Sequence, residues 1–187
     1  IYNVQDIYPD VAINLGILTN RLVIQFFKAM ERFVYAKAAA VSVLSQGFRQ
    51  NLLNKKVPAE KIKVIPNFVD TDFVQPLAPN NGFAKKSNLN GKYVVLFAGN
   101  VGHSQGLTYV LDAVRLVSDR SNILFLIVRN GTVKLALEKK AETMGLDNVH
   151  FLPFQPMEEV PGMYASSDLC LVPLRQGIAQ NSVPSKV

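Results

Sequence analysis

The chain has 187 residues, of which 49% are hydrophobic, and a net charge of +6, so it holds enough apolar material for one large domain or parts of two. It contains a single cysteine, Cys170, which excludes an internal disulfide and fits a reducing cytoplasm. No uncharged apolar run reaches the ~18 residues that a membrane-spanning helix needs, and the cations are too dispersed to predict a nucleic-acid-binding surface.

An amphipathic helix is predicted over residues 21–37. Its apolar residues form a wide stripe beside four cations, Arg21, Lys28, Arg32 and Lys37. Residues 1–91 hold 11 of the 20 Lys and Arg residues but only 6 of the 14 Asp and Glu residues, so the basic excess lies in this half. Such a stripe can rest on an anionic bilayer surface or cover a sheet as a core helix. The width of the stripe favours the core helix, and bilayer contact is the alternative.

A strand, a helix and a second strand are predicted next. The run Ala38–Leu44 is small and β-branched, as in a strand that is buried on both faces. Ser45 can cap the following helix, which ends before Pro58. The second strand, Ile62–Ile65, stops at Pro66.

Residues 72–91 are rich in Pro, Asn, Lys and Gly, which predicts an exposed linker or loop. From Lys92 onward, short apolar runs alternate with helical patterns. The predicted strands are Tyr93–Ala98, Ile123–Val128, Val149–Leu152 and Leu169–Val172, and the predicted helices are Leu107–Val117, Val133–Met144 and Met157–Tyr164. This alternation is typical of an α/β fold with a parallel sheet covered by helices on both faces.

Motifs in five places follow one another in an order that is typical of a known family. They read VSVLSQGFRQ, VIPNFVD, LFAGNVGHSQGL, NVHFLPFQP and ASSDLCLVPL. Together they resemble the family 4 glycosyltransferases, which are retaining enzymes of the GT-B fold, and most of all the members that build bacterial exopolysaccharides, O-antigens and colanic acid. The resemblance implies Rossmann-like, doubly wound parallel sheets.

The same resemblance divides the chain into parts. Residues 1–75 match the end of the N-terminal, acceptor-side domain and the hinge. Residues 76–91 match a linker or loop, and residues 92–187 match a truncated C-terminal domain that binds the nucleotide-sugar. The chain is therefore expected to be an excised fragment that binds donor weakly and transfers nothing on its own.

The first candidate site is the glycine turn after the strand Tyr93–Ala98. Gly99 and Gly102 allow the backbone to approach a ligand closely, and the next helix presents its positive end to a phosphate. The family usually has Arg and Lys in this turn, where this chain has Asn100 and Gln105, so charge assistance for the leaving diphosphate is reduced. A turn of this kind also simply joins a strand to a helix.

Two further turns are candidates for the donor site. Arg129 stands where the family commonly has glycine, and it can fork onto phosphate oxygens or only decorate a surface turn. In relatives the backbone at the turn around Gln155 reads the edge of the nucleotide base, so the identity of this side chain says little.

The loop 173–185 is the fourth candidate. The family has a Glu-x7-Glu pair here, and the segment SVPSKV places the second Glu beyond the end of the chain and Asn181 where the first would stand. Ser182 and Ser185 can offer hydroxyls and amides to the diphosphate, with Lys186 as a counter-ion. The segment can equally be an ordinary loop before a helix.

The resemblance implies a reaction in polysaccharide biosynthesis. A sugar would pass from a UDP- or GDP-sugar to a saccharide or lipid-linked acceptor with retention, in the cytoplasm or at the inner face of the plasma membrane, and the main catalytic residues of the family would lie outside this chain. No cofactor and no metal ion is expected. Asp70-Thr71-Asp72 spells a DxD metal motif, but it lies in the hinge and offers too few oxygen ligands.

Three other functions are left open by the sequence. A GT-B epimerase of UDP-sugars has the same architecture, and a non-catalytic nucleotide-sugar-binding module fits the neutral Asn181 and Gln105. An NAD-dependent oxidoreductase would require G-x-G-x-x-G, and the spacing of Gly99, Gly102 and Gly106 differs from it.

Overall fold

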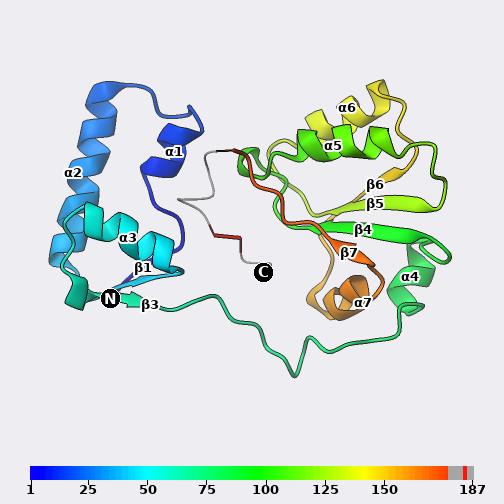
Figure 1. Cartoon of the computed structure of the whole chain (residues 1–187), viewed down its shortest axis with the longest axis horizontal. Helices are drawn as coiled ribbons and strands as arrows, with labels where there is room; N and C mark the ends of the chain where they lie inside the picture. Colours follow the sequence, from blue (N-terminus) through cyan, green and yellow to red (C-terminus); the bar gives the residue numbers. More distant parts are fainter. Residues whose placement is uncertain (177–182, 185–187) are drawn as a thin grey trace. The chain divides into compact units, whose positions relative to one another are not determined.

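The computed structural model of the chain describes residues 1–176 and 183–184 and divides into two compact units. Unit 1 contains residues 1–68 with the described residues 174–176 and 183–184, and unit 2 contains residues 69–173. Figure 1 shows one sheet in each unit, and both sheets are parallel. The division falls before the expected linker at 76–91, and the expected domain assignment stays a prediction.

Unit 1 is built on a three-stranded sheet in the order β1-β2-β3. Its strands are β1 (Tyr2–Val4), β2 (Val41–Val43) and β3 (Ile62–Val64), and its helices are α1 (Asp10–Asn14), α2 (Arg21–Lys37) and α3 (Gln46–Asn54), with a 3-10 turn, η1 (Ala59–Lys61). All three residues of the central strand β2 are buried, as expected for a strand covered on both faces. The predicted strands at 38–44 and 62–65 are confirmed, each shorter than expected.

Helix α3 begins where the sequence predicts. Ser45 is its N-cap, and the Ser45 hydroxyl accepts the backbone N–H of Phe48 at 3.2 Å. Phe48 and Leu52 then pack in the core of unit 1 against the buried valines of β2. The helix ends at Asn54, before Pro58.

Helix α2 is confirmed over residues 21–37, but the described chain does not cover its apolar stripe. In this fully described helix only Tyr35 is buried, whereas Leu22, Phe26 and Phe33 are 76%, 63% and 62% exposed. The helix packs through the side that carries Tyr35 and leaves its apolar side outward. The expectation of a core helix that covers a sheet with its stripe is therefore wrong for the described structure.

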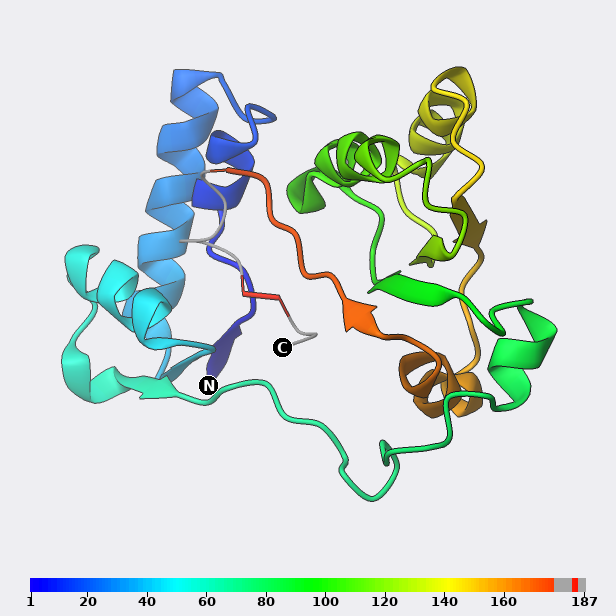
Figure 2. The same ribbon diagram turned by 45° about the vertical axis from the view of Figure 1, so that its right-hand side comes forward.

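Unit 2 is built on a four-stranded sheet in the order β6-β5-β4-β7, in which every pair is parallel. The strands are β4 (Tyr93–Ala98), β5 (Ile123–Val128), β6 (Val149–Leu152) and β7 (Leu169–Cys170). The first three match the predicted strands residue for residue, and the fourth ends earlier than predicted. Figure 2 shows β7 in orange beside β4 in green.

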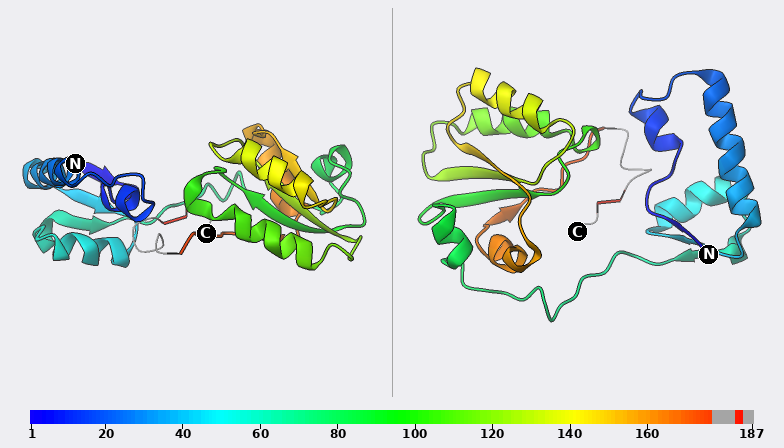
Figure 3. Two further views of the ribbon diagram at one scale, coloured as in Figure 1. Left: turned by 90° about the horizontal axis from the view of Figure 1, so that it is seen from above. Right: turned by 180° about the vertical axis from the view of Figure 1, so that it is seen from behind.

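Helices cover both faces of this sheet (Figure 3). They are α4 (Gly82–Lys86), α5 (Leu107–Leu116), α6 (Lys134–Thr143) and α7 (Val160–Ala165), with the 3-10 turns η2 (His103–Gln105) and η3 (Met157–Glu159). Because side chains alternate along a strand, Val95 and Phe97 of β4 pack with α5 and α6, and Val94 and Leu96 pack with α4 and α7. The predicted doubly wound α/β arrangement is confirmed.

The expected linker before β4 contains helix α4, whose Phe83 and Ala84 are buried. Asn81 caps this helix, because its side-chain oxygen accepts the N–H groups of Phe83 and Ala84 at 2.8 and 3.2 Å. The Asn81 NH2 group also donates to the carbonyl of Gly162 and the hydroxyl of Ser166, both at 2.9 Å. The prediction of an exposed loop is wrong here, since one asparagine fastens the segment to α7.

Candidate functional site

The loops that follow β4, β5 and β6 gather at one edge of the unit 2 sheet, because these strands are adjacent and parallel. The loops hold residues 99–106, 129–133 and 153–156. In open α/β sheets, ligands bind outside the carboxyl ends of the strands. The structure therefore places the first three candidate sites of the sequence along a single edge.

The loops after β4 and β5 are fastened to each other by their backbones. Val101, which is fully buried, donates its N–H to the Asn130 carbonyl at 3.2 Å and accepts the N–H of Val133 at 3.1 Å. Gly131 packs so closely on Val101 that a Cβ atom at position 131 would collide with the Val101 carbonyl oxygen. The shape of this edge therefore depends on a glycine at position 131.

The amides of the glycine turn are engaged within the protein. Gly99 donates to the Val128 carbonyl at 3.1 Å, and Gly102 donates to Oε1 of Gln105 at 3.2 Å. The side chain of Asn100 lies close by, since its Nδ2 would be 3.1 Å from a Cβ atom on Gly102. The amides of the two glycines are thus not free to cradle a ligand, and Gln105 keeps only its NH2 group for one.

Arg129 follows β5 with a φ of 115°, a backbone conformation that favours glycine. This angle gives a physical reason for the glycine that the family commonly has here. The Arg129 N–H donates to the Leu152 carbonyl at 3.2 Å. Its guanidinium carbon lies 5.6 Å from the centroid of the Phe154 ring, within cation–π range. The exposed cation is therefore held at the sheet edge, over the loop that follows β6.

Gln155 lies in that same loop, and its side chain folds back on its own turn. The Gln155 Nε2 donates to the Pro153 carbonyl at 3.0 Å. One of its polar atoms is thus occupied locally, and its part in binding a base stays a prediction.

The sequence reasoning missed Lys134, the first residue of α6. Its side chain is only 15% exposed, and its Nζ lies 3.2 Å from the Leu152 carbonyl oxygen and 3.4 Å from Oδ1 of Asn130. Oε1 of Glu138, one turn further along α6, lies 3.7 Å from the Lys134 Nζ and balances its positive charge. The spacing of Lys134 and Glu138 is visible in the sequence, but it suggests an ordinary surface ion pair on a helix.

The remaining candidates are the C-terminal loop and the DxD triplet. Four predicted residues lie outside the described part of the chain: Asn181, Ser182, Ser185 and Lys186. Asp70 Oδ1 accepts the N–H groups of Asp72 at 3.0 Å and Phe73 at 3.2 Å, so its carboxylate shapes a turn. Among residues 1–176 and 183–184, no group of three or more His, Cys, Asp or Glu side chains is placed to hold a metal ion.

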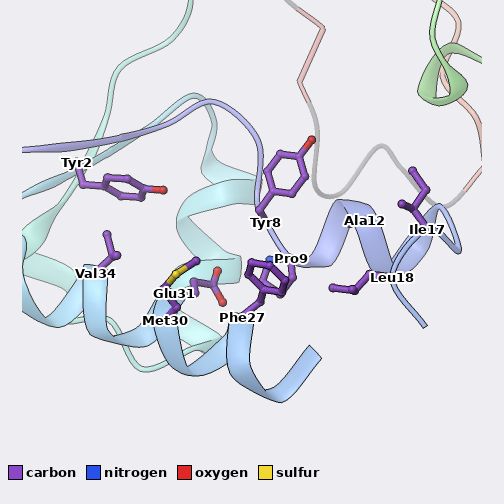
Figure 4. A pocket seen from close by; sticks show the side chains of 10 residues that line it. All are labelled: Tyr2, Tyr8, Pro9, Ala12, Ile17, Leu18, Phe27, Met30, Glu31 and Val34. Atoms are coloured by element: carbon purple, nitrogen blue, oxygen red, sulfur yellow. The ribbon is translucent and has the colours of Figure 1, made fainter. Parts of the chain in front are cut away.

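Unit 1 contains an apolar cavity of about 370 Å³ (Figure 4). Tyr8, Ile17, Phe27 and Met30 are among the side chains that line it. Phe27 and Met30 are also 37% and 47% exposed on α2, so these two lining residues are partly open to solvent. No helix of the described chain is both long and apolar enough to cross a bilayer.

Glu31 is the carboxylate in the lining of this cavity, and it is already paired. Lys55 Nζ lies 2.6 Å from Glu31 and 2.9 Å from Asp10, and the Tyr35 hydroxyl donates to Glu31 at 3.0 Å. Burial, and then the charge of Glu31, raise the pKa of Tyr35 well above its ordinary value. This network fastens α2 to the segment after α3, so Glu31 is not free to act on a ligand.

Family models match two parts of the chain. The model of glycosyl transferases group 1 matches residues 80–179, which contain the sheet edge described above. The model of glycosyltransferase family 4 matches residues 17–73.

Curated relatives align along nearly all of the chain. The putative colanic acid biosynthesis glycosyl transferase WcaI of Escherichia coli (strain K12) is 30% identical over 193 aligned residues, covering 100% of this chain and 47% of the relative. The probable glycosyltransferase WbjE of Pseudomonas aeruginosa is 24% identical, covering 98% of this chain and 46% of the relative. The chain thus spans about half the length of the curated relatives it matches.

Solved structures share the fold. WaaG, a glycosyltransferase involved in lipopolysaccharide biosynthesis, superposes with a TM-score of 0.76 at 19% identity, covering 94% of this chain and 50% of WaaG. Anabaena Alr3699/HepE, solved in complex with UDP and glucose, superposes with a TM-score of 0.72 at 18% identity, covering 90% of this chain and 44% of HepE. The predicted GT-B type of fold is confirmed by these neighbours.

Proposed function

Because the chain belongs to the glycosyl transferases group 1 family, we propose that the protein carrying it transfers a sugar from a nucleotide-sugar to an acceptor hydroxyl, with retention at the anomeric carbon. The observation that carries the proposal is the common carboxyl edge of β4, β5 and β6, which lies inside the matched segment. HepE has been solved with UDP-glucose, and WcaI is named for colanic acid biosynthesis. These relatives support a UDP-sugar donor, with GDP-sugar as the alternative, and a role in polysaccharide biosynthesis.

The barrier of this reaction is dominated by charge. When the glycosidic C–O bond breaks, negative charge builds on the leaving diphosphate, and donors held at fixed positions stabilise this change more than the ground state. The sheet edge offers the guanidinium of Arg129, the NH2 groups of Asn100 and Gln105, and the positive end of α5, which begins at Leu107. Arg129 is the cation of this set, so we expect it to supply the charge assistance that the neutral glycine turn lacks.

Arg129→Gly gives a clean test, because the φ of 115° suits glycine and the variant should fold. In the full-length protein that carries this chain, calorimetry should show UDP or GDP binding roughly ten- to a hundredfold more weakly in the variant, since a bond to a charged acceptor is worth about 1.5–3 kcal/mol. Arg120→Ala is the matched control, because Arg120 is 68% exposed and precedes β5 at the opposite end of the strand. Equal nucleotide affinity in both variants and the wild type would contradict the role of Arg129.

The same titration series separates the other functions. NAD binding without UDP or GDP binding would indicate an oxidoreductase. Conversion of a UDP-sugar to its epimer without acceptor would indicate an epimerase, and nucleotide-sugar binding without any transfer would indicate a binding module. Proton NMR of the product tests retention, because a product of inverted anomeric configuration would contradict it.

We also propose that the protein acts at the cytoplasmic face of a membrane on a lipid-linked acceptor. The outward side of α2 carries Leu22, Phe26 and Phe33, and the Lys37 Nζ lies 5.9 Å above the Phe33 ring. An uncovered apolar helix face accompanied by cations is the pattern of an interfacial helix. The apolar cavity that Phe27 and Met30 help to line can receive an acyl or prenyl chain of the acceptor.

A further inference from the structure

The ammonium group of Lys134 is held at the sheet edge rather than in solvent. Its side chain is 15% exposed, compared with 41% for Lys140 on the same helix and 66% for Lys86 on α4. An ammonium has three N–H donors, and Lys134 has three acceptors near it: the Leu152 carbonyl, Oδ1 of Asn130 and Oε1 of Glu138. Lys134 is therefore directed toward these three oxygens of the protein, two of them within hydrogen-bond distance, so we expect an effect of Lys134 on binding to pass through a neighbour.

Asn130 is the neighbour that can transmit such an effect. A lysine ammonium donates and never accepts, so the contact at 3.4 Å assigns the oxygen of the Asn130 amide to Lys134. The NH2 end of the amide must then face the other way, and it has no hydrogen-bond partner within the described residues. The backbone of Asn130 is fixed as well, since its carbonyl accepts the N–H of Val101 at 3.2 Å.

Asn130 is exposed and directly follows Arg129. Its free NH2 group therefore lies at the carboxyl edge of the sheet, beside a cation, in a place where the amides of Gly99 and Gly102 are already occupied. A diphosphate offers only acceptors, so an NH2 group of fixed direction is complementary to it, and a bond to a charged oxygen is stronger than one to a neutral oxygen.

We infer that Lys134 is a positioning residue of the donor site, which turns the Asn130 amide so that its NH2 group binds the diphosphate of the nucleotide. The inference rests on the proposed nucleotide-sugar site and adds two residues to it. It predicts that Asn130 contacts the nucleotide and that Lys134 acts only through Asn130.

Asn130→Asp separates binding from folding. The aspartate keeps the oxygen that Lys134 requires and adds an ion pair, so the unfolding midpoint should be unchanged or higher. It loses the NH2 donor and repels the diphosphate, so the affinity for UDP, or for GDP if that nucleotide binds instead, should fall by tenfold or more in calorimetry. Asn122→Asp adds the same charge at the exposed residue before β5 and should leave the affinity unchanged.

Lys134→Met tests the indirect role. Its nucleotide affinity should fall several-fold, and the double variant Asn130→Ala with Lys134→Met should bind no more weakly than Asn130→Ala alone, because both changes act on one bond. Lys134→Arg should recover part of the affinity, and Lys139→Met, an exposed position on the same helix, should bind as the wild type does.

The outcomes distinguish this inference from the proposed function. A wild-type protein that binds no nucleotide would overturn both. Normal binding by the wild type together with unchanged affinity in Asn130→Asp, or additive losses in the double variant, would overturn this inference alone. If Lys134→Met reduced the stability but left the nucleotide affinity normal, Lys134 would only stabilise the end of β6 through the Leu152 carbonyl. That result would also overturn the inference.

Discussion

The shape of the site edge depends directly on the absence of a Cβ atom at Gly131. A methyl group there would meet the carbonyl of Val101, which belongs to the backbone and cannot move aside. Gly131→Ala should therefore destabilise unit 2 by roughly 1–3 kcal/mol, the usual cost of overpacking, and it should weaken nucleotide binding because the loops after β4 and β5 would separate. Urea unfolding of the variant measures the first effect. Gly82→Ala is the control, since nothing lies within 4 Å of a Cβ atom at that position, and equal stability of both variants would contradict the prediction.

Tyr35 gives a prediction about pH. Its hydroxyl donates to Glu31 at 3.0 Å, and burial together with Glu31 raises its pKa in the folded chain. The unfolded chain therefore ionises first as the pH rises, so the stability that the hydroxyl provides is present below about pH 10 and is lost above it. Tyr35→Phe should be less stable than the wild type by about 1 kcal/mol at pH 7, and the difference should shrink above pH 10. A constant difference in urea unfolding from pH 7 to pH 11 would rule this out.

At the scale of elements, the proposed membrane contact depends on the outward side of α2. Phe26→Ser with Phe33→Ser removes two side chains that are 63% and 62% exposed, so unit 1 should stay folded while binding to vesicles that contain phosphatidylglycerol falls strongly in co-sedimentation. High salt should weaken the binding of the wild type, because the cations of α2 contribute. Leu116→Ser with Leu135→Ser is the matched control, since these residues are 83% and 82% exposed on α5 and α6. If the α2 variant binds vesicles normally, or unfolds as a core variant would, the face is not a membrane contact.

The elements show what the sequence can and cannot specify. β4, β5 and β6 were predictable to the residue, because short apolar runs between turn-forming residues have few alternatives in an α/β chain. Helix α4 was missed, because its stability comes from Asn81 bonding to residues about 80 positions away, at Gly162 and Ser166. For α2 the pattern correctly predicted an apolar side, but a pattern of one helix does not say what covers that side.

One part of the candidate site was likewise predictable from the sequence, and another part was not. The alternation of strands and helices was enough to bring the turns at 99–106 and 129–131 to one edge, since parallel strands end together. The contact of Lys134 with the Leu152 carbonyl joins residues 18 positions apart, which no local pattern contains. The contacts of Gln105 with Gly102 and of Lys134 with Asn130 are local, but they depend on side-chain directions that the spacing alone does not give.

At the scale of the whole molecule, each unit carries its own parallel sheet and its own buried core, which in unit 2 consists of one cluster on each face of the sheet. The basic excess belongs mainly to residues 1–91, which include the proposed membrane face, whereas the segment matched to glycosyl transferases group 1 holds the proposed nucleotide site. The two proposed contacts are therefore assigned to different units, and a ligand of one unit need not stabilise the other.

Binding at the edge of β4, β5 and β6 should raise the thermal midpoint of the transition that contains unit 2, by the equivalent of about 2.7 kcal/mol when UDP is present at about 100 times its dissociation constant. Leu111→Ala and Leu52→Ala serve as markers, since both side chains are fully buried, one in each unit, and each substitution costs about 2–5 kcal/mol. In scanning calorimetry of the full-length protein, the transition that UDP raises should be the one that Leu111→Ala lowers. If UDP instead raised a transition that only Leu52→Ala lowers, the nucleotide would bind unit 1, and the proposed site would be in the wrong half of the chain.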